Sequence, residues 1–230
     1  MNYRDLEAKL LAASGLTRRP VAVAFPEAPP PGVPKYQGAQ PAGCSFWRLA
    51  AGSDVFYTLP GDHYNCPIGS YTHKLDAPQL NQTLSLMIGL GYVKMEDLPG
   101  IFRLPQPPRV IVYAALGDTP VDPDVVLFAG RPANLMLLME AANRAGVASN
   151  LPLLGRPTCM AIPAALLNGA VVSSGCIGSR TYTQIGDDEL YVAIPGKDLN
   201  RLAQEIQTIA AANTQLAQYH QTRRQALSGI

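Results

Sequence analysis

The sequence carries little charge and almost no excess of either sign. Only 15% of its 230 residues are charged, and 18 basic against 17 acidic side chains leave a formal net charge of +1. Binding of nucleic acid needs a basic face that neutralises phosphates, so this composition predicts no nucleic-acid partner. With 47% hydrophobic residues, the chain has the composition of a core-rich globular protein.

Long hydrophobic runs and familiar site signatures are missing as well. No run reaches the roughly 18 apolar residues needed to span a bilayer, and the first fifteen residues mix both charge signs, unlike the apolar core of a signal peptide. We therefore expect no membrane partner and a cytoplasmic location. The GxSxG, HExxH, EF-hand, Walker, Rossmann and kinase motifs are absent, so no motif decides whether the chain is an enzyme.

What the sequence does contain is four cysteines: Cys44, Cys66, Cys159 and Cys176. In a cytosolic protein such residues are thiols or metal ligands rather than disulfides. None of them forms a CxxC pair, which excludes a zinc ribbon and a thioredoxin motif.

Hydrophobic periodicity predicts an α/β fold in which outer helices cover a mixed sheet. The runs 109–116 and 124–129 are nearly all apolar, as strands buried on both faces would be. We expect one domain over residues 1–230. Further strands are predicted at 21–25, 54–59, 170–174 and 189–194, and helices at 3–14, 44–51, 78–90, 132–145, 159–167 and 197–225.

A weak internal repeat divides the chain into halves of about 16–95 and 105–200. The segment NCPIGS around Cys66 resembles GCIGS around Cys176 with one residue removed, and each follows a predicted strand. Each of those strands follows a short helix that begins near a cysteine, Cys44 or Cys159. The pattern favours an internal duplication over chance similarity in a sequence rich in alanine and glycine.

The same residues carry a family resemblance. The stretches CSFWRLAAG and NCPIGSYT, the later PTCMAIPAAL and the GCIGSR segment resemble the domain of unknown function 169 family, over about residues 19–199. The resemblance implies that these cysteine positions are typical of the family and form a shared site. It does not imply what the site binds.

If a pseudo-two-fold axis relates the halves, equivalent cysteines approach one another there. Four thiolates from dispersed positions suit a [4Fe–4S] cluster or a tetrahedral zinc site, and zinc sites usually show a close cysteine pair, so we predict a cluster held by Cys44, Cys66, Cys159 and Cys176. Cluster ligation by only two or three cysteines would leave an open iron for substrate. The structural alternative is that all four are small core residues.

Two further features could take part in chemistry. His63 precedes Cys66 by three residues in a Gly-Asp turn, where it could ligate a metal or donate a proton, or be a solvated turn residue. Gly175, Gly178, Ser179 and Arg180 could form a nest for a phosphate or carboxylate, including that of a flavin. Alternatively Arg180 binds carbonyls or pairs with Asp187 or Asp188.

The last predicted helix has an apolar stripe: Leu199, Leu202, Ile206, Ile209 and Leu216, with Asn213 on the same side. A heptad-like seam with one polar member is typical of paired helices, so we expect a homodimer. Taken together, the sequence predicts a cytosolic iron–sulfur protein with an electron-transfer or redox role on a small anionic molecule, and with an electron-transfer partner. The alternatives are a non-enzymatic small-ligand-binding domain, for a phosphate, carboxylate or flavin, and a zinc-binding structural protein.

Overall fold

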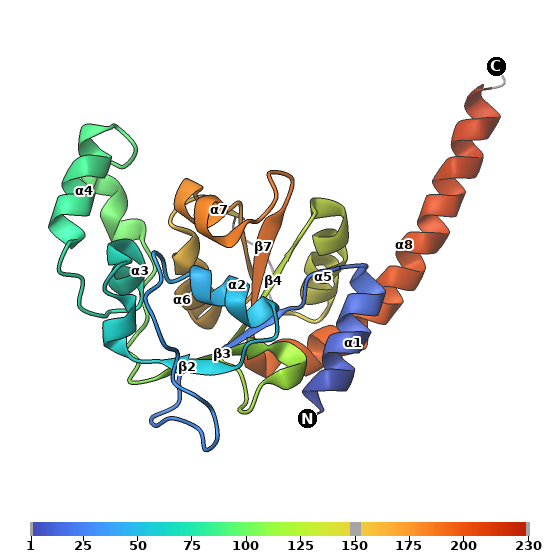
Figure 1. Cartoon of the computed structure of the whole chain (residues 1–230). Coiled ribbons are helices and arrows are strands. Elements are labelled where there is room, and N and C mark those ends of the chain that lie inside the picture. The colour runs from blue at the N-terminus through green and yellow to red at the C-terminus, as the bar shows by residue number, and fades with distance from the viewer. Residues whose placement is uncertain (1, 148–152, 229–230) are drawn as a thin grey trace.

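A seven-stranded mixed sheet forms the centre of the molecule (Figure 1). The computed structural model describes residues 2–147 and 153–228. The strands lie in the order β2-β3-β1-β4-β7-β6-β5, and every neighbouring pair is antiparallel except β5 with β6. Their bounds are β1 Val21–Ala24, β2 Phe56–Thr58, β3 Ile111–Ala115, β4 Val125–Gly130, β5 Leu153–Leu154, β6 Val171–Ser173 and β7 Leu190–Pro195.

Helices cover both faces of this sheet, because its strands alternate apolar side chains between two cores. Val125 and Leu127 of β4 belong to one core, and Val126 and Phe128 belong to the other. The first core is covered by α2 (Ser45–Ala51) and α6 (Ala161–Asn168), and the second by α1 (Tyr3–Ser14), α5 (Pro132–Arg144) and the start of α8 (Leu199–Ser228). The predicted α/β fold with a mixed sheet and outer helices is confirmed.

Short helices connect these elements. They are η1 Pro60–His63, α3 Pro67–Thr72, α4 Leu80–Gly89, η2 Met95–Gly100, η3 Leu116–Asp118, η4 Thr158–Met160, α7 Ile177–Thr183 and η5 Gly196–Asp198. The helices α3 and α7, which follow Cys66 and Cys176 directly, are absent from the sequence-based prediction, because each is less than two turns of an α-helix and shows no apolar period.

The two halves of the sheet have the same internal order. On one side of the sheet the strands run β2-β3-β1 from the edge inwards, and on the other side β6-β7-β4 follow the same order inside the edge strand β5. These two sides divide between β3 and β4, so β3 groups with the first half although the sequence-based boundary puts it in the second. The inner strands β1 and β4 meet as an antiparallel pair, with Ala22 opposite Val126. A duplication would produce this order, and the duplication itself stays a prediction.

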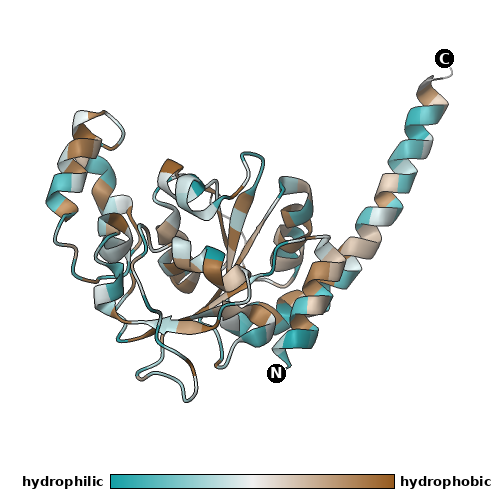
Figure 2. Ribbon diagram, in the orientation of Figure 1, coloured by the Kyte–Doolittle hydropathy of each residue, from teal (hydrophilic) through white to brown (hydrophobic). Residues whose placement is uncertain are grey.

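The helix α8 packs on the body only at its beginning. Leu199, Leu202 and Ile206 are fully buried, whereas residues 211–227 are all exposed. Figures 1 and 2 show the second part of α8 projecting beyond the body, mostly in hydrophilic colours. No helix of the described residues is both long and apolar enough to cross a membrane.

We expect truncation after Ile209 to convert a dimer into a monomer. The first half of the apolar stripe packs within its own chain, so any dimer contact must use the uncovered part, where Leu216 is 57% exposed. Light scattering should give the mass of two chains for the full-length protein and the mass of one chain for the truncated protein. A full-length monomer, or an unchanged dimer after truncation, contradicts self-association through α8.

Candidate functional site

All four cysteines line one cavity of about 720 Å³. It lies on the side of the sheet that α2 and α6 cover, and Cys44 and Cys66 also belong to the core there. Cys44, Cys66 and Cys176 each stand immediately before a helix, α2, α3 and α7 respectively, while Cys159 lies within η4. None of the four forms a disulfide. The structure therefore brings together the cysteines that the repeat relates.

Contacts between the two halves make this convergence. Helix α3 of the first half packs on η4 of the second, and α7 of the second half packs on α2 of the first. As a result the Thr72 hydroxyl of α3 lies beside the thiol of Cys159, and the Ser179 hydroxyl of α7 lies beside that of Cys44. The Thr158 Oγ1 accepts a hydrogen bond of 2.5 Å from the backbone N–H of Cys176.

Burial favours the protonated thiols of Cys44, Cys66 and Cys159. It raises the pKa of Cys44 to about 12, with Cys66 and Cys176 adding to the shift and Ser179 opposing it. Burial also raises the pKa of Cys66, against the backbone N–H groups of Gly43 and Gly69, and raises that of Cys159 well above its usual value. A metal binds the thiolate, so a metal bound by these cysteines would displace protons, and its affinity would increase as the pH rises.

The neighbouring thiols contribute to the raised pKa values of Cys44, Cys66 and Cys159. Among the described residues, no group of three His, Cys, Asp or Glu side chains could hold one metal ion. Tetrahedral zinc with bonds of about 2.3 Å requires sulfurs about 3.8 Å apart. In a [4Fe–4S] cluster each thiolate binds a different iron, so the four sulfurs surround a wider volume.

The hydroxyl of Ser179 lies at the cavity wall without a hydrogen-bond partner among the described residues. Its hydroxyl is buried, lines the cavity and makes no hydrogen bond of standard geometry with a described residue. Because it lies beside the Cys44 thiol, it can donate once Cys44 becomes a thiolate. Buried polar groups are nearly always satisfied, so the Ser179 hydroxyl is available to donate to an acceptor in the cavity.

His63 lies in the core rather than in the cavity wall. The turn η1 places it under Phe46, with ring centroids 5.0 Å apart, and its Nε2 lies 2.9 Å from Thr58 Oγ1. Burial lowers its pKa to about 3, so the imidazole is neutral at neutral pH. The structure thus gives His63 a packing role, which neither the ligand nor the solvated-turn interpretation of the sequence anticipated.

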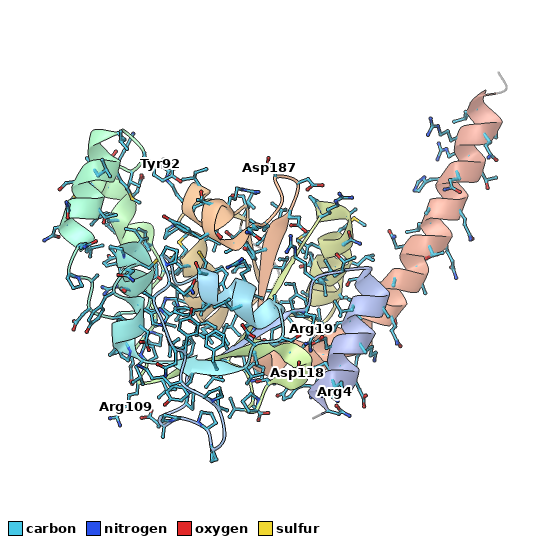
Figure 3. All side chains as sticks on the ribbon, in the orientation of Figure 1. Arg4, Arg19, Tyr92, Arg109, Asp118 and Asp187 are labelled. Carbon is cyan, nitrogen blue, oxygen red and sulfur yellow. The ribbon has the colours of Figure 1, made fainter. Side chains whose placement is uncertain are left out.

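Arg180 binds backbone carbonyls. Its guanidinium donates to Ser174 O at 2.5 Å, Gly186 O at 2.7 Å and Glu189 O at 3.1 Å. These bonds hold the turn between α7 and β7, at whose tip Figure 3 labels Asp187. Asp188 pairs instead with Arg131 at 2.8 Å. The carbonyl-binding alternative for Arg180 therefore describes the structure.

Gly175 and Gly178, which precede Arg180, lie in different surroundings. Gly175 adopts a φ of +77°, which brings its backbone against the Arg180 side chain. Gly178 lines the cavity, and a Cβ there would meet nothing within 4 Å.

The outer wall of the cavity comes from residues 76–100, which we call the arm. The arm contains α4 and η2 and buries none of its residues, and Figure 1 shows it standing apart from the body beside α3. At its base, Leu104 N donates to Thr72 O and Arg103 Nε to Tyr71 O. Its tip meets the body where the guanidinium of Arg156 stacks on the ring of Tyr92, 4.6 Å from the centroid.

Sequence reasoning missed Thr72, Arg156 and Tyr92 at this site. Each comes from a segment that shows no motif, and only the folded chain brings them to the cavity. Thr158 carried a partial signal, because it stands at the start of a predicted helix.

The fold and the cavity define an α/β protein with a four-cysteine site between two similarly ordered half-sheets. The chain belongs to the domain of unknown function 169 family, described as uncharacterised ArCR proteins, which it matches over residues 9–205. No curated protein and no solved structure matches it.

Proposed function

We propose that the four cysteines hold a [4Fe–4S] cluster and that the protein carries out electron transfer or redox chemistry on a small anionic molecule. The observation that carries the proposal is the lining of one cavity by Cys44, Cys66, Cys159 and Cys176. We prefer a cluster to zinc because zinc sites usually include a close cysteine pair, which this sequence lacks. Such a cluster supplies single electrons at a potential set by its surroundings.

The residues around the thiols have definite parts in this proposal. Ser179 would donate a hydrogen bond to the Cys44 sulfur once that sulfur is a thiolate, the Thr72 hydroxyl lies beside the Cys159 sulfur, and Gly43 and Gly69 offer backbone N–H groups to Cys66. Donors to ligand sulfurs stabilise the reduced state and raise the potential. Apolar neighbours such as Met160 exclude water. His63 takes no proton-transfer role, because it is buried outside the lining.

The free thiols also bear on the cellular location of the protein and on its partner. Four unpaired cysteines are typical of a reducing compartment, so we propose a cytoplasmic location. A redox role further requires an electron-transfer partner.

Replacement of each cysteine in turn by alanine tests the proposal. We expect every variant, reconstituted anaerobically with iron and sulfide, to lose at least about tenfold in bound iron, because a lost ligand costs more than a lost supporting contact. The measurement is iron content together with absorbance near 400 nm. Full iron content in the Cys176→Ala protein alone would indicate a three-cysteine cluster, and full content in all four would contradict the proposal.

A matched control lies in the same cavity. Met160→Leu conserves volume at a buried lining position and removes no thiol, so it should retain the iron content of the natural protein. Circular dichroism of each cysteine variant establishes that loss of iron does not follow from loss of fold.

The size of the cavity favours a second candidate, a small-ligand-binding domain whose cysteines are wall residues. A volume of about 720 Å³ falls in the range of about 300–1,000 Å³ that small-molecule sites occupy. This candidate predicts colourless protein without iron, and the same cysteine variants would then alter ligand affinity alone. A flavin held by Arg180 loses support, because the guanidinium is engaged with carbonyls.

A further inference from the structure

We propose that Arg156 binds the oxyanion end of a small, largely apolar molecule in the cysteine-lined cavity. The molecule is a carboxylate or a phosphate ester with an apolar body. The proposal deepens the proposed function and rests on it in one respect: the proposed cluster would be the redox group next to the bound molecule. It moves the anion site from Arg180, whose guanidinium binds backbone carbonyls and does not line the cavity, to Arg156, which does line it.

Arg156 is the one cation among the described residues that line this cavity. Its side chain makes no hydrogen bond and no ion pair with any described residue, and its guanidinium stacks on the ring of Tyr92. Tyr92, labelled in Figure 3, projects from the arm towards the body. The stack holds the plane of the guanidinium while leaving its N–H donors free, and this planar fork matches the two oxygens of a carboxylate or phosphate.

The charges near Arg156 leave it available. Two carboxylates also line the cavity, Glu96 and Asp97. Glu96 lies 3.6 Å from Lys94 Nζ, and Asp97 accepts a hydrogen bond of 3.0 Å from Lys94 N, so each has a partner in the residue that immediately precedes η2. Arg156 is also absent from the groups that shift the cysteine pKa values. It is therefore not a counter-ion of the thiols.

The remainder of the wall defines the body of the ligand. Besides the thiols and Arg156, the cavity is lined by Leu84 and Met87 of α4, Ile101 at the base of the arm, and Met160 of η4. The eight atoms of a cluster fill only part of a volume of about 720 Å³. The rest suits an aliphatic or aromatic group, whose burial there is favourable.

Calorimetric titration of the full chain tests this assignment with benzoate and phenyl phosphate as probes and benzyl alcohol as the uncharged control. We expect Arg156→Gln to weaken binding of at least one anionic probe by about tenfold or more and to leave benzyl alcohol unchanged. Arg156→Lys keeps the positive charge but loses the two parallel N–H donors of the guanidinium. Its affinity for the anionic probe should therefore lie between that of the natural protein and that of Arg156→Gln. Comparison of the two anions decides between a carboxylate and a phosphate ligand.

Arg103 supplies the matched control. It too is exposed and stacks on a tyrosine, with its guanidinium 4.2 Å from the centroid of Tyr71, but it lies outside the cavity lining. Arg103→Gln should bind the probes as the natural protein does. Equal weakening by both variants, full affinity in Arg156→Gln, or no binding of either anion by the natural protein would overturn the proposal.

Iron is measured in the same preparations, so the two proposals fail separately. Arg156-dependent binding in protein that never holds iron supports the anion site and contradicts the cluster. Iron-loaded protein that binds neither anion supports the cluster and contradicts the anion site.

Discussion

Acidification from pH 6.5 to pH 4 should remove on the order of 5 kcal/mol from the free energy of unfolding, because two histidines are buried as neutral groups. Burial lowers the pKa of His63 to about 3 and that of His73 to about 4. In the unfolded chain both titrate near 6.5. The stability that they contribute is therefore complete above pH 6.5 and is lost as the pH falls towards 4 and 3. Each histidine adds a slope of about 1.4 kcal/mol per pH unit.

The local contacts of His63 and His73 suggest substitutions that keep the hydrogen bonds of each side chain but replace the titratable imidazole by a neutral amide. His63 uses Nε2 towards Thr58, which glutamine can imitate, and His73 donates from Nδ1 to Gly69 O at 3.0 Å, which asparagine can imitate. In the His63→Gln/His73→Asn double variant, the mean slope of unfolding free energy against pH between 4.5 and 6.5 should fall by about 2 kcal/mol per unit.

Urea unfolding followed by the fluorescence of Trp47 measures this slope. His220→Gln, on the exposed part of α8, is the control and should leave the slope as it is. If the double variant unfolds with the slope of the natural protein, the two histidines are not the buried neutral groups that the structure shows.

Gly196→Ala should destabilise the protein by at least about 3 kcal/mol. Gly196 follows β7, and its N–H donates to Asp124 O at 2.8 Å. A Cβ at this position would overlap the carbonyl of Pro123, which is backbone and cannot rotate away. The chain must therefore separate β7 from the entry to β4, at the centre of the sheet.

Two other glycines calibrate this expectation. At Gly130 a Cβ would meet the end of the Leu16 side chain, which can move, and at Gly89 in α4 it would meet nothing within 4 Å. Thermal unfolding should rank the losses Gly196→Ala, then Gly130→Ala, with Gly89→Ala neutral or stabilising by up to about 1 kcal/mol. A Gly196→Ala protein as stable as Gly89→Ala would contradict the close approach of β7 to Pro123.

The sequence was informative where period and composition decide structure. The apolar run 109–116 contains β3, and the run 124–129 largely overlaps β4, since strands buried on both faces leave no polar alternation. The repeat around Cys66 and Cys176 indicated which cysteines to compare, and the folded chain brings all four to one cavity. Their sharing of a cluster stays a prediction.

What the sequence did not show depends on contacts between segments far apart in the chain. The surroundings of His63 look like a solvated Gly-Asp turn, and only packing under Phe46 makes it a core residue. Arg180 stands in an anion-binding pattern, yet the carbonyls that satisfy it come from a turn whose path the sequence does not specify. Arg156 and Tyr92 lie 64 positions apart and meet through the arm.

Anaerobic purification followed by iron and acid-labile sulfide determination tests the central claim most directly. The four-cysteine cavity predicts brown protein with about four iron and four sulfide per chain and absorbance near 400 nm. Protein that is colourless, and that takes up no iron when iron and sulfide are supplied, would contradict the claim that Cys44, Cys66, Cys159 and Cys176 hold an iron–sulfur cluster.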